Sequence, residues 1–177
     1  VKRKFFGTLF NTYSFFSLYA NIDKFKFTIS NFDIKTLDKL DKWILSELNT
    51  LILECSKNFD AFEPTKVCRD IQFFVVNKLS NWYVRLSRRK FWKGEYNESK
   101  ISAYQTLYEC LEKIAIISSP IIPFYSNRLF NDLNKISKRH KIESVHLTSF
   151  PHASLEVINK RLENQMSIAQ EITSMIL

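Results

Sequence analysis

The densest run of side chains with chemical potential lies between Leu79 and Trp92, Leu-Ser-Asn-Trp-Tyr-Val-Arg-Leu-Ser-Arg-Arg-Lys-Phe-Trp. On a helix, which turns ~100° per residue, Asn81, Arg85, Arg88 and Trp92 fall along one strip that borders the apolar face. A guanidinium is a planar fork of donors that grips phosphate, and its flat face stacks on bases or rings. Aromatic rings interleaved with cations are typical of surfaces that hold unpaired nucleotides. The strip therefore indicates a polyanion-binding surface.

The same residues also permit a structural interpretation. Arg85 lies close to the apolar stripe, so we expect it to pair with a buried carboxylate or to cap helix carbonyls, and we expect Trp82 in the core. For Arg88, Arg89 and Lys93, a solvated surface and a binding surface remain equally open. The sequence thus identifies the segment, while the role of each cation in it depends on the fold.

Charge elsewhere in the chain supports an anionic partner. The net charge is +8 over 177 residues, and it is concentrated in three basic islands. These islands are Lys2-Arg3-Lys4 with Lys24 and Lys26, Arg85 to Lys93, and Lys135 to Lys141. Such islands on an otherwise balanced chain indicate nucleic acid or anionic lipid, although an island by itself can also be a solvated surface.

Composition and periodicity predict how these residues are positioned. The chain holds two glycines and four prolines with 45% apolar residues, which favours long helices with few tight turns. Apolar residues recur every three or four positions, so we predict an all-α, antiparallel helical bundle. The expected helices cover roughly residues 2–21, 37–59, 64–92, 101–118, 124–137 and 155–177, with Val145 to Leu147 extended. In the third helix, the residues predicted to face the core are Val67, Ile71, Phe74, Val75, Leu79, Trp82 and Leu86.

We predict two parts in the chain, a bundle over 1–151 and the start of a C-terminal helical extension over 152–177. The last helical pattern reaches the chain end without a stop signal, so we expect the extension to be truncated.

Several classes of protein are disfavoured. Cys55, Cys68 and Cys110 are widely spaced, which predicts reduced thiols in the cytoplasm and neither a disulfide framework nor a cysteine zinc site. The three histidines show no metal-ligand spacing, so no metal site is expected. No apolar run has the ~18–20 residues of a membrane span.

The string from Asn81 to Trp92 resembles the hallmark segment of the anticodon-binding domain of isoleucyl-tRNA synthetases. Four further segments are similar to that family in the same order and extend the resemblance over roughly residues 1–151. They are Asn11 with Phe15 or Phe16 and Tyr19; Asp41 to Ser46; Ala103 to Tyr108 with Pro120 to Phe124; and Ser144 to Leu147 before Phe150-Pro151.

The resemblance implies part of an ATP-dependent, Mg-using class I ligase that attaches isoleucine to tRNA(Ile). The family's phosphate-binding signature, His-Ile-Gly-His, is absent from this sequence, so no catalytic residue and no cofactor are expected in this stretch. A zinc-binding tail in the parent stays open. The string Lys135-Ile136-Ser137-Lys138-Arg139 superficially matches a second catalytic signature, but it follows the bundle helices instead of preceding them. We therefore expect helix C-terminal charges or RNA contacts there.

The residues expected to touch tRNA combine the strip with neighbouring basic and amide side chains. They are Asn11, Lys24, Lys26, Asn81, Arg85, Arg88, Arg89, Trp92 and Lys93. The expected partners are tRNA(Ile) and the remainder of the synthetase chain, with a monomer and no membrane. The alternatives are a valyl- or leucyl-type synthetase domain, a helical protein-interaction scaffold, or a peripheral membrane protein anchored by Phe5, Phe6 and Phe16.

Overall fold

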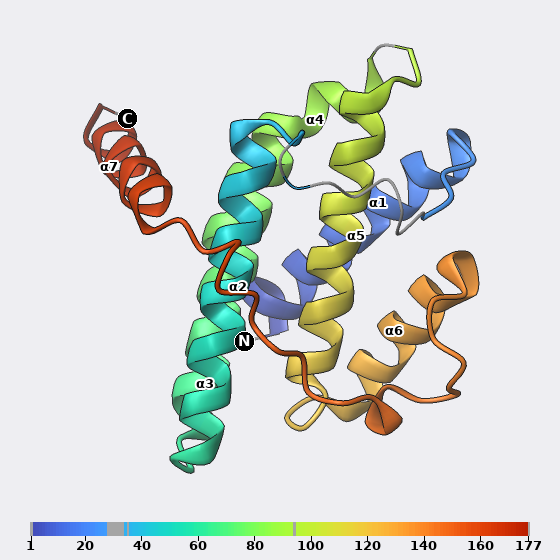
Figure 1. The fold of residues 1–177 in the computed structure, drawn as a ribbon, viewed down its shortest axis with the longest axis vertical. Coiled ribbons are helices and arrows are strands. Elements are labelled where there is room, and N and C mark those ends of the chain that lie inside the picture. The colour runs from blue at the N-terminus through green and yellow to red at the C-terminus, as the bar shows by residue number, and fades with distance from the viewer. Residues whose placement is uncertain (1, 28–33, 35, 94, 177) are drawn as a thin grey trace.

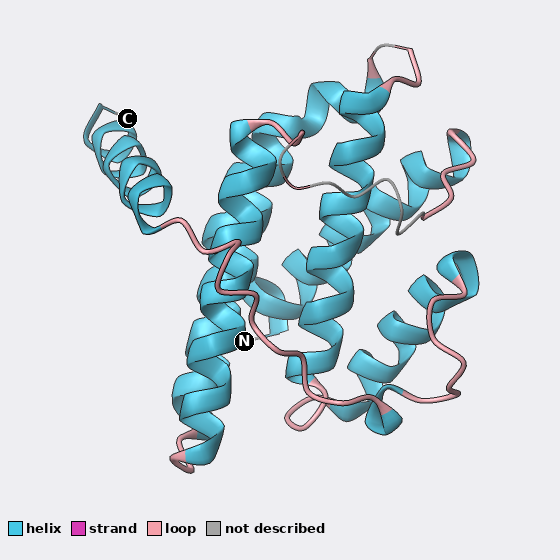
Figure 2. Cartoon of the chain, in the orientation of Figure 1, coloured by secondary structure: helices cyan, strands magenta, loops and turns pink. Residues whose placement is uncertain are grey.

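The described part of the chain is built from helices joined by loops of different lengths. A computed structural model describes residues 2–27, 34, 36–93 and 95–176. Figure 2 shows helices and loops throughout these ranges and no strand. The prediction of an all-α fold is confirmed. The predicted loop over 22–35 lies in part outside the described residues.

The helices follow one another closely along the chain, and most lie within a few residues of their predicted bounds. In order they are η1 (Lys2–Gly7), α1 (Thr8–Ile22), α2 (Lys39–Asp60), α3 (Pro64–Phe73), η3 (Phe74–Val84), α4 (Arg85–Trp92), α5 (Glu98–Ser118), α6 (Pro123–Ser137), η4 (Val145–Leu147) and α7 (Lys160–Ile176). Here η1 and η3 are π-helical and η4 is a single 3₁₀ turn. Because η1 runs directly into α1, and α3 through η3 into α4, each set forms one continuous helix.

Successive long helices run in opposite directions (Figure 1). The hydroxyl of Tyr83 donates to Asp41 near the start of α2, whereas the amide of Asn58 near its end donates to Asp70 in α3. The rings of Phe91 and Tyr104 then pair α4 with the first half of α5, with centroids 4.9 Å apart. The order of these contacts makes the molecule an antiparallel bundle.

Local sequence explains where the helices begin. The side chain of Asp38 accepts from the backbone N–H groups of Leu40 and Asp41, so it caps α2. Asn97 caps α5 in the same way by accepting from the N–H of Lys100 at 3.0 Å. Proline occupies the first turn of α3 and of α6, where its missing N–H leaves no hydrogen bond unmade.

The long helix buries a different set of residues from the predicted one beyond Leu79. Buried positions recur every fourth residue, at Ile71, Val75, Leu79, Tyr83, Ser87 and Phe91. The π-helical stretch η3 contributes to this spacing between Val75 and Tyr83, because its hydrogen bonds reach five residues along the chain and each turn takes up more residues. Leu86, predicted to face the core at α-helical spacing, is 53% exposed, so that prediction is wrong. Trp82 is half-buried against the core.

The segment after α6 returns to the bundle through irregular structure. Val145 to Leu147 forms a 3₁₀ turn, not the extended segment predicted from its apolar residues. The side chain of Asn127 in α6 accepts from Ser144 Oγ and from the N–H of Val145, both at 3.0 Å. These bonds hold the turn against α6, and Val145 is buried as a result.

The last helix begins at Lys160 and is fastened to α2. The carboxylate of Glu163 accepts from Ser46 Oγ at 2.5 Å and from Thr50 Oγ1 at 2.8 Å. Asn159 starts the helix by accepting from the N–H of Leu162 at 3.0 Å. The predicted division of the chain after residue 151 stays a prediction.

Candidate nucleic-acid interface

The strip predicted on the third helix is present on the surface. Asn81, Arg85 and Arg88 are exposed, and Trp92 is 55% exposed. Arg85 makes no ion pair or hydrogen bond through its side chain with any described residue, so the interpretation of Arg85 as a buried structural cation is wrong. The strip therefore carries guanidinium groups whose charge no carboxylate of the described chain neutralises.

Arg88 packs on an aromatic ring and not against a carboxylate of the described residues. Its guanidinium carbon lies 5.9 Å from the ring centroid of Phe15 in α1, and Phe15 packs edge-to-face on Phe91 at 5.1 Å. A cation above an aromatic face is oriented and weakly stabilised, but it keeps its donors for another partner. Asn11 is exposed one turn before Phe15 on the same face of α1, so the fold brings it toward Arg88 and the strip.

Beside the strip lies a polar hollow between the end of α4 and the start of α5. It encloses about 520 Å³ and is lined by Arg89, Lys90, Lys93, Glu95, Asn97, Ser99 and Lys100. Arg89 and Lys93 are exposed on its wall. Lys90 and Lys100 pair with carboxylates outside this lining, so Arg89 and Lys93 are the cations that the hollow offers beside its one carboxylate, Glu95, and they favour an anionic group.

Lys90 belongs to the same island but has a structural role. Its ammonium group pairs with Asp38 and lies 3.4 Å from Asp41 Oδ2. Asp41 is buried and also accepts from the hydroxyl of Tyr83 at 2.5 Å. Burial raises the pKa of Asp41 to about 6, against the lowering effects of Tyr83 and Lys90. This cluster joins the start of α2 to α4 and thereby fixes the helix that carries the strip.

Lys24 and Lys26, in the segment that follows α1, are exposed. The neighbouring Asp23 accepts from Lys100 and, at 2.5 Å, from the hydroxyl of Tyr104. Although burial opposes it, these two donors hold the pKa of Asp23 below its ordinary value. Asp23 is thus occupied by α5, through Lys100, which also lines the hollow.

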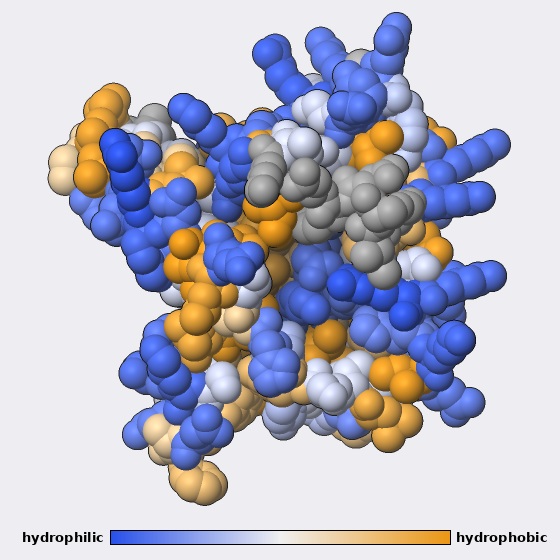
Figure 3. Space-filling model, viewed as in Figure 1, coloured by the Kyte–Doolittle hydropathy of each residue, from blue (hydrophilic) through white to orange (hydrophobic). Residues whose placement is uncertain are grey.

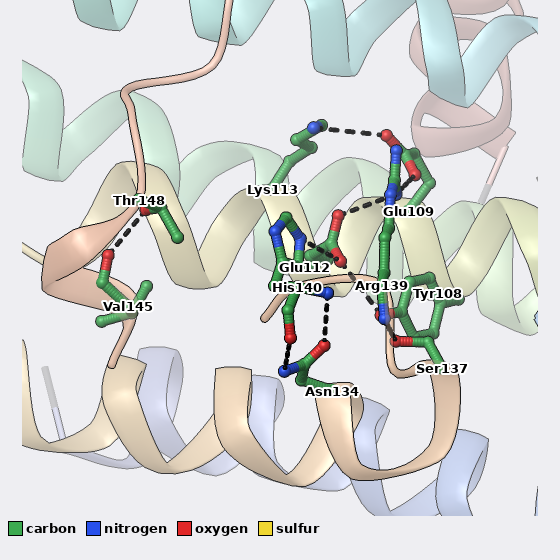
Figure 4. Close-up of polar contacts among 10 residues, drawn as sticks. All are labelled: Tyr108, Glu109, Glu112, Lys113, Asn134, Ser137, Arg139, His140, Val145 and Thr148. Atoms are coloured by element: carbon green, nitrogen blue, oxygen red, sulfur yellow. Dashed lines mark hydrogen bonds and ion pairs between the residues drawn. The ribbon is translucent and has the colours of Figure 1, made fainter. Parts of the chain in front are cut away.

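The third island, Lys135 to Lys141, is divided between structure and surface (Figure 4). Arg139 Nη1 donates to Glu109 at 2.6 Å and to Glu112 at 2.8 Å, while His140 Nε2 lies 3.0 Å from Glu112 Oε1. The Asn134 side chain bonds both the N–H and the C=O of His140. These contacts fasten the loop after α6 to α5, so Arg139 is an anchor of the fold.

Sequence reasoning did not find the structural cations Lys90, Lys100 and Arg139. Each pairs with carboxylates that lie between 27 and 77 residues away in the chain. No pattern at helical spacing reveals such partners. The neighbouring Lys135 was recoverable, because its partner Asp132 is three residues away on the same helix.

The membrane-anchor alternative is wrong for this fold. Phe5 and Phe16 are buried, and Phe6 packs edge-to-face on Tyr125 with ring centroids 5.6 Å apart. Among the helices that the structure describes, none is both long and apolar enough to span a bilayer. The described residues also contain no group of three or more His, Cys, Asp or Glu side chains arranged to hold a metal ion.

The bundle with its cationic, aromatic edge is the architecture of a helical domain that accompanies a tRNA ligase. The family model described as the anticodon-binding domain of tRNA ligases matches residues 41–177, and the chain belongs to this family. The match covers the long helix, the residues that line the hollow, and the contacts of Arg139 and His140 with α5.

Three relatives that match nearly the whole chain are all named isoleucine–tRNA ligase. The chain is 52% identical to an isoleucine–tRNA ligase of Cytophaga hutchinsonii over 99% of its length, and 51% identical to one of Bacteroides thetaiotaomicron over 100%. A third, from Dehalococcoides mccartyi, is 43% identical over 99%. The chain spans only 16%, 15% and 17% of these three relatives, respectively, so it corresponds to one segment of each.

Proposed function

We propose that this chain is the part of an isoleucine–tRNA ligase that binds tRNA(Ile) by its anticodon stem and loop. The observation that carries the proposal is the strip of Asn81, Arg85, Arg88 and Trp92, exposed and without carboxylate partners in a domain of the anticodon-binding family. The relatives' shared name supports isoleucine, against the valyl- or leucyl-type alternative.

Recognition divides between the cations and the flat groups of this surface. Arg85, Arg88 and Arg89 follow the sugar-phosphate backbone, which sets affinity and register. Trp92 stacks on a splayed base, and the side-chain amides of Asn11 and Asn81 bond base edges or sugars. Lys93, on the wall of the hollow, adds a further phosphate contact.

The purpose of this contact in the parent enzyme is positioning. A ligase must hold the acceptor end of tRNA at its catalytic site, and small misplacements there cost rate steeply. Gripping the anticodon end fixes the far arm of the same rigid molecule. The parent would use ATP and Mg²⁺ at a catalytic site in another part of its chain, as a monomer in the cytoplasm, where the free thiols of Cys55, Cys68 and Cys110 stay reduced.

The test is a titration of the full-length ligase with a tRNA(Ile) transcript at several salt concentrations. Arg88→Ala and Arg89→Ala should each weaken binding and lower the slope of log K against log[salt] by about one unit, because each removes one phosphate contact. Lys66→Ala is the matched control, since Lys66 is an exposed cation at the opposite end of the long helix.

Unchanged affinity and slope in both arginine variants would remove the strip from the interface. Equal binding of tRNA(Ile) and of an unrelated polyanion by the wild-type enzyme would overturn the proposed function itself. The chain alone should not aminoacylate tRNA under any salt condition.

A further inference from the structure

Two lysines hold a left-handed backbone directly after helices. Lys24 has φ 52° after α1, and Lys138 has φ 51° as the cap residue of α6. Residues with a Cβ are uncommon in this conformation, and helices that end in it usually place glycine there. Lysine brings no local hydrogen bond that would favour the left-handed region, as Asn or Asp does. Its presence at both positions points to a role for the side chain.

The residues that follow Lys24 pack along α5 toward Lys138. The ring of Phe25 stacks on Tyr104 at 5.0 Å, and the ring of Phe27 lies 4.4 Å from Tyr108, one turn further along α5. The hydroxyl of Tyr108 in turn donates to Ser137 Oγ at 2.7 Å, beside Lys138. The end of α1 is therefore linked to the end of α6 through two adjacent turns of one helix.

Alternation along this segment directs its cations outward. Phe25 is buried and Phe27 packs against the core, whereas the intervening Lys24 and Lys26 are exposed. Lys138 and Lys141 are exposed beyond the end of α6. The cations thus lie on the surface while the rings between them are packed on tyrosines.

Three described carboxylates near this surface, Asp23, Glu109 and Glu112, already have partners. Asp23 accepts from Lys100 and Tyr104, and Glu112 is engaged by Arg139 and His140 (Figure 4). Arg139 and Lys113 both pair with Glu109. Neither Lys24 nor Lys138 forms an ion pair with any residue that the structure describes. The positive charge at both positions is therefore left for an external anion.

We propose that Lys24 and Lys138, with Lys141, form a second phosphate-binding surface that continues the strip and hollow of α4 along the backbone of the same folded RNA. This inference rests on the proposed function. Figure 3 shows hydrophilic side chains extending from the upper and right-hand edges of the molecule, where Figure 1 places the ends of α4, α1 and α6. Lys100, which lines the hollow and pairs with Asp23, connects the two surfaces.

The chemistry of the surface favours RNA over a lipid bilayer. A peripheral membrane surface combines cations with apolar side chains that insert between lipids. Here the apolar residues between the lysines, Phe25 and Phe27, are committed to Tyr104 and Tyr108. Phe25 and Phe27 are thus not available to insert into lipid, and the cations beside them suit a hydrated phosphate backbone.

Glycine substitution separates a role in the backbone from a role in binding. Lys24→Gly and Lys138→Gly, made in the full-length ligase, should leave the melting temperature unchanged or raise it, because glycine adopts positive φ freely. Each should weaken tRNA(Ile) binding roughly sixfold at 0.15 M salt, the factor that a slope of about one unit gives between 0.15 M and 1 M. Lys24→Arg and Lys138→Arg should restore both the affinity and the slope.

Phe62→Gly is the matched control. Among the described residues other than glycine, Phe62 is the third with a left-handed backbone, at φ 56°, and it is 91% exposed after α2. Phe62 follows the end of α2, whereas the cluster of Asp38 and Lys90 lies at the start of α2. The length of this helix, roughly 33 Å at 1.5 Å per residue, separates Phe62 from the proposed RNA surface near α4. This variant should share the thermal behaviour of the lysine variants and bind tRNA as the wild type does.

The outcomes distinguish this inference from the proposed function. Unchanged affinity and slope in both lysine-to-glycine variants, while Arg88→Ala still lowers them, would overturn the second surface and leave the proposed function standing. A lower melting temperature with an unchanged slope would make the lysines structural and overturn it as well. Lysine-dependent binding to phosphatidylserine vesicles that tRNA does not displace would assign the surface to lipid and also overturn it.

Discussion

The two basic islands Arg85 to Lys93 and Lys135 to Lys141 look alike in sequence and differ in the folded chain. In the first, Arg85, Arg88 and Arg89 are exposed without carboxylate partners, and only Lys90 is drawn into an acidic cluster. In the second, Arg139 pairs with Glu109 and Glu112. A run of cations therefore identifies a binding surface only after the carboxylates that the fold brings to it have been assigned.

The difference follows from what each island packs against. Arg88 lies over the ring of Phe15, which supplies no formal charge. Arg139 lies over Phe27 but also reaches the carboxylates of α5, and Glu112 is only 1% exposed there. A buried carboxylate requires a cation, so Arg139 is needed for the stability of the fold. Arg88 has no such partner and remains available for a ligand.

The largest effect that separates the islands is expected for Arg139→Ala. Its loss leaves the Glu112 carboxylate buried with His140 and the hydroxyl of Tyr108 as its partners, and the free energy of unfolding should fall by about 2–4 kcal/mol. Arg88→Ala should change it by less than about 0.5 kcal/mol, because its side chain is exposed. Urea denaturation measures the free energy of unfolding of both variants. Equal losses in the two variants would contradict the structural difference between the islands.

A smaller effect, dependent on pH, is expected at Asp41, the buried carboxylate that lies beside Lys90 of the first island. The pKa of Asp41, raised from 3.8 to about 6, means that the folded chain binds this proton more tightly than the unfolded chain does. The stability that Asp41 contributes is therefore complete below pH 3.8 and is lost as pH rises toward 6.

Asp41→Asn removes this titration while keeping an oxygen for Tyr83. Relative to the wild type, the variant should gain up to about 3 kcal/mol of unfolding free energy between pH 4 and pH 6.5. Thermal or urea unfolding at several pH values measures the difference between the two proteins. A difference independent of pH would show that Asp41 is ionised in both states, and the Lys90 cluster would then be an ordinary ion pair.

The smallest effects are expected for the exposed members of both islands. Arg85→Ala and Lys135→Ala should each change the free energy of unfolding by no more than about 0.5 kcal/mol. Arg85 is exposed, and the Lys135 ion pair with Asp132 lies at the surface on one helix. A loss above about 1.5 kcal/mol for Arg85→Ala would restore its interpretation as a structural cation.

Much of the fold was predictable because its signals are local. The spacing of apolar residues, the caps Asp38 and Asn97 and the prolines at positions 64 and 123 act within one or two turns of helix. The exposure of Leu86 was not predictable, since nothing in the periodicity signals the π-helical hydrogen bonds of η3. The 3₁₀ turn at Val145 depends on Asn127, 18 residues earlier.

The candidate interface was predictable only in part. The residue types and spacing of the strip at Asn81 to Trp92 follow directly from the sequence. The roles of Arg85 and Arg139 do not, because each depends on whether a distant carboxylate lies within reach. Lys138 was considered only as a helix-end charge or an RNA contact, and its left-handed backbone became visible only in the folded chain.

The π-helical stretch η3 also sets the rotational phase of everything that follows it in the same helix. Each residue that exchanged its five-residue hydrogen bond for a four-residue one would turn α4 about its own axis without breaking the helix. Ser87 and Phe91 would then leave the core together, and Arg88 and Trp92 would swing away from the side of the molecule that they share with α1. The angle at which the domain presents its cationic strip is therefore tuned ten residues upstream, by backbone geometry that no charged side chain supplies.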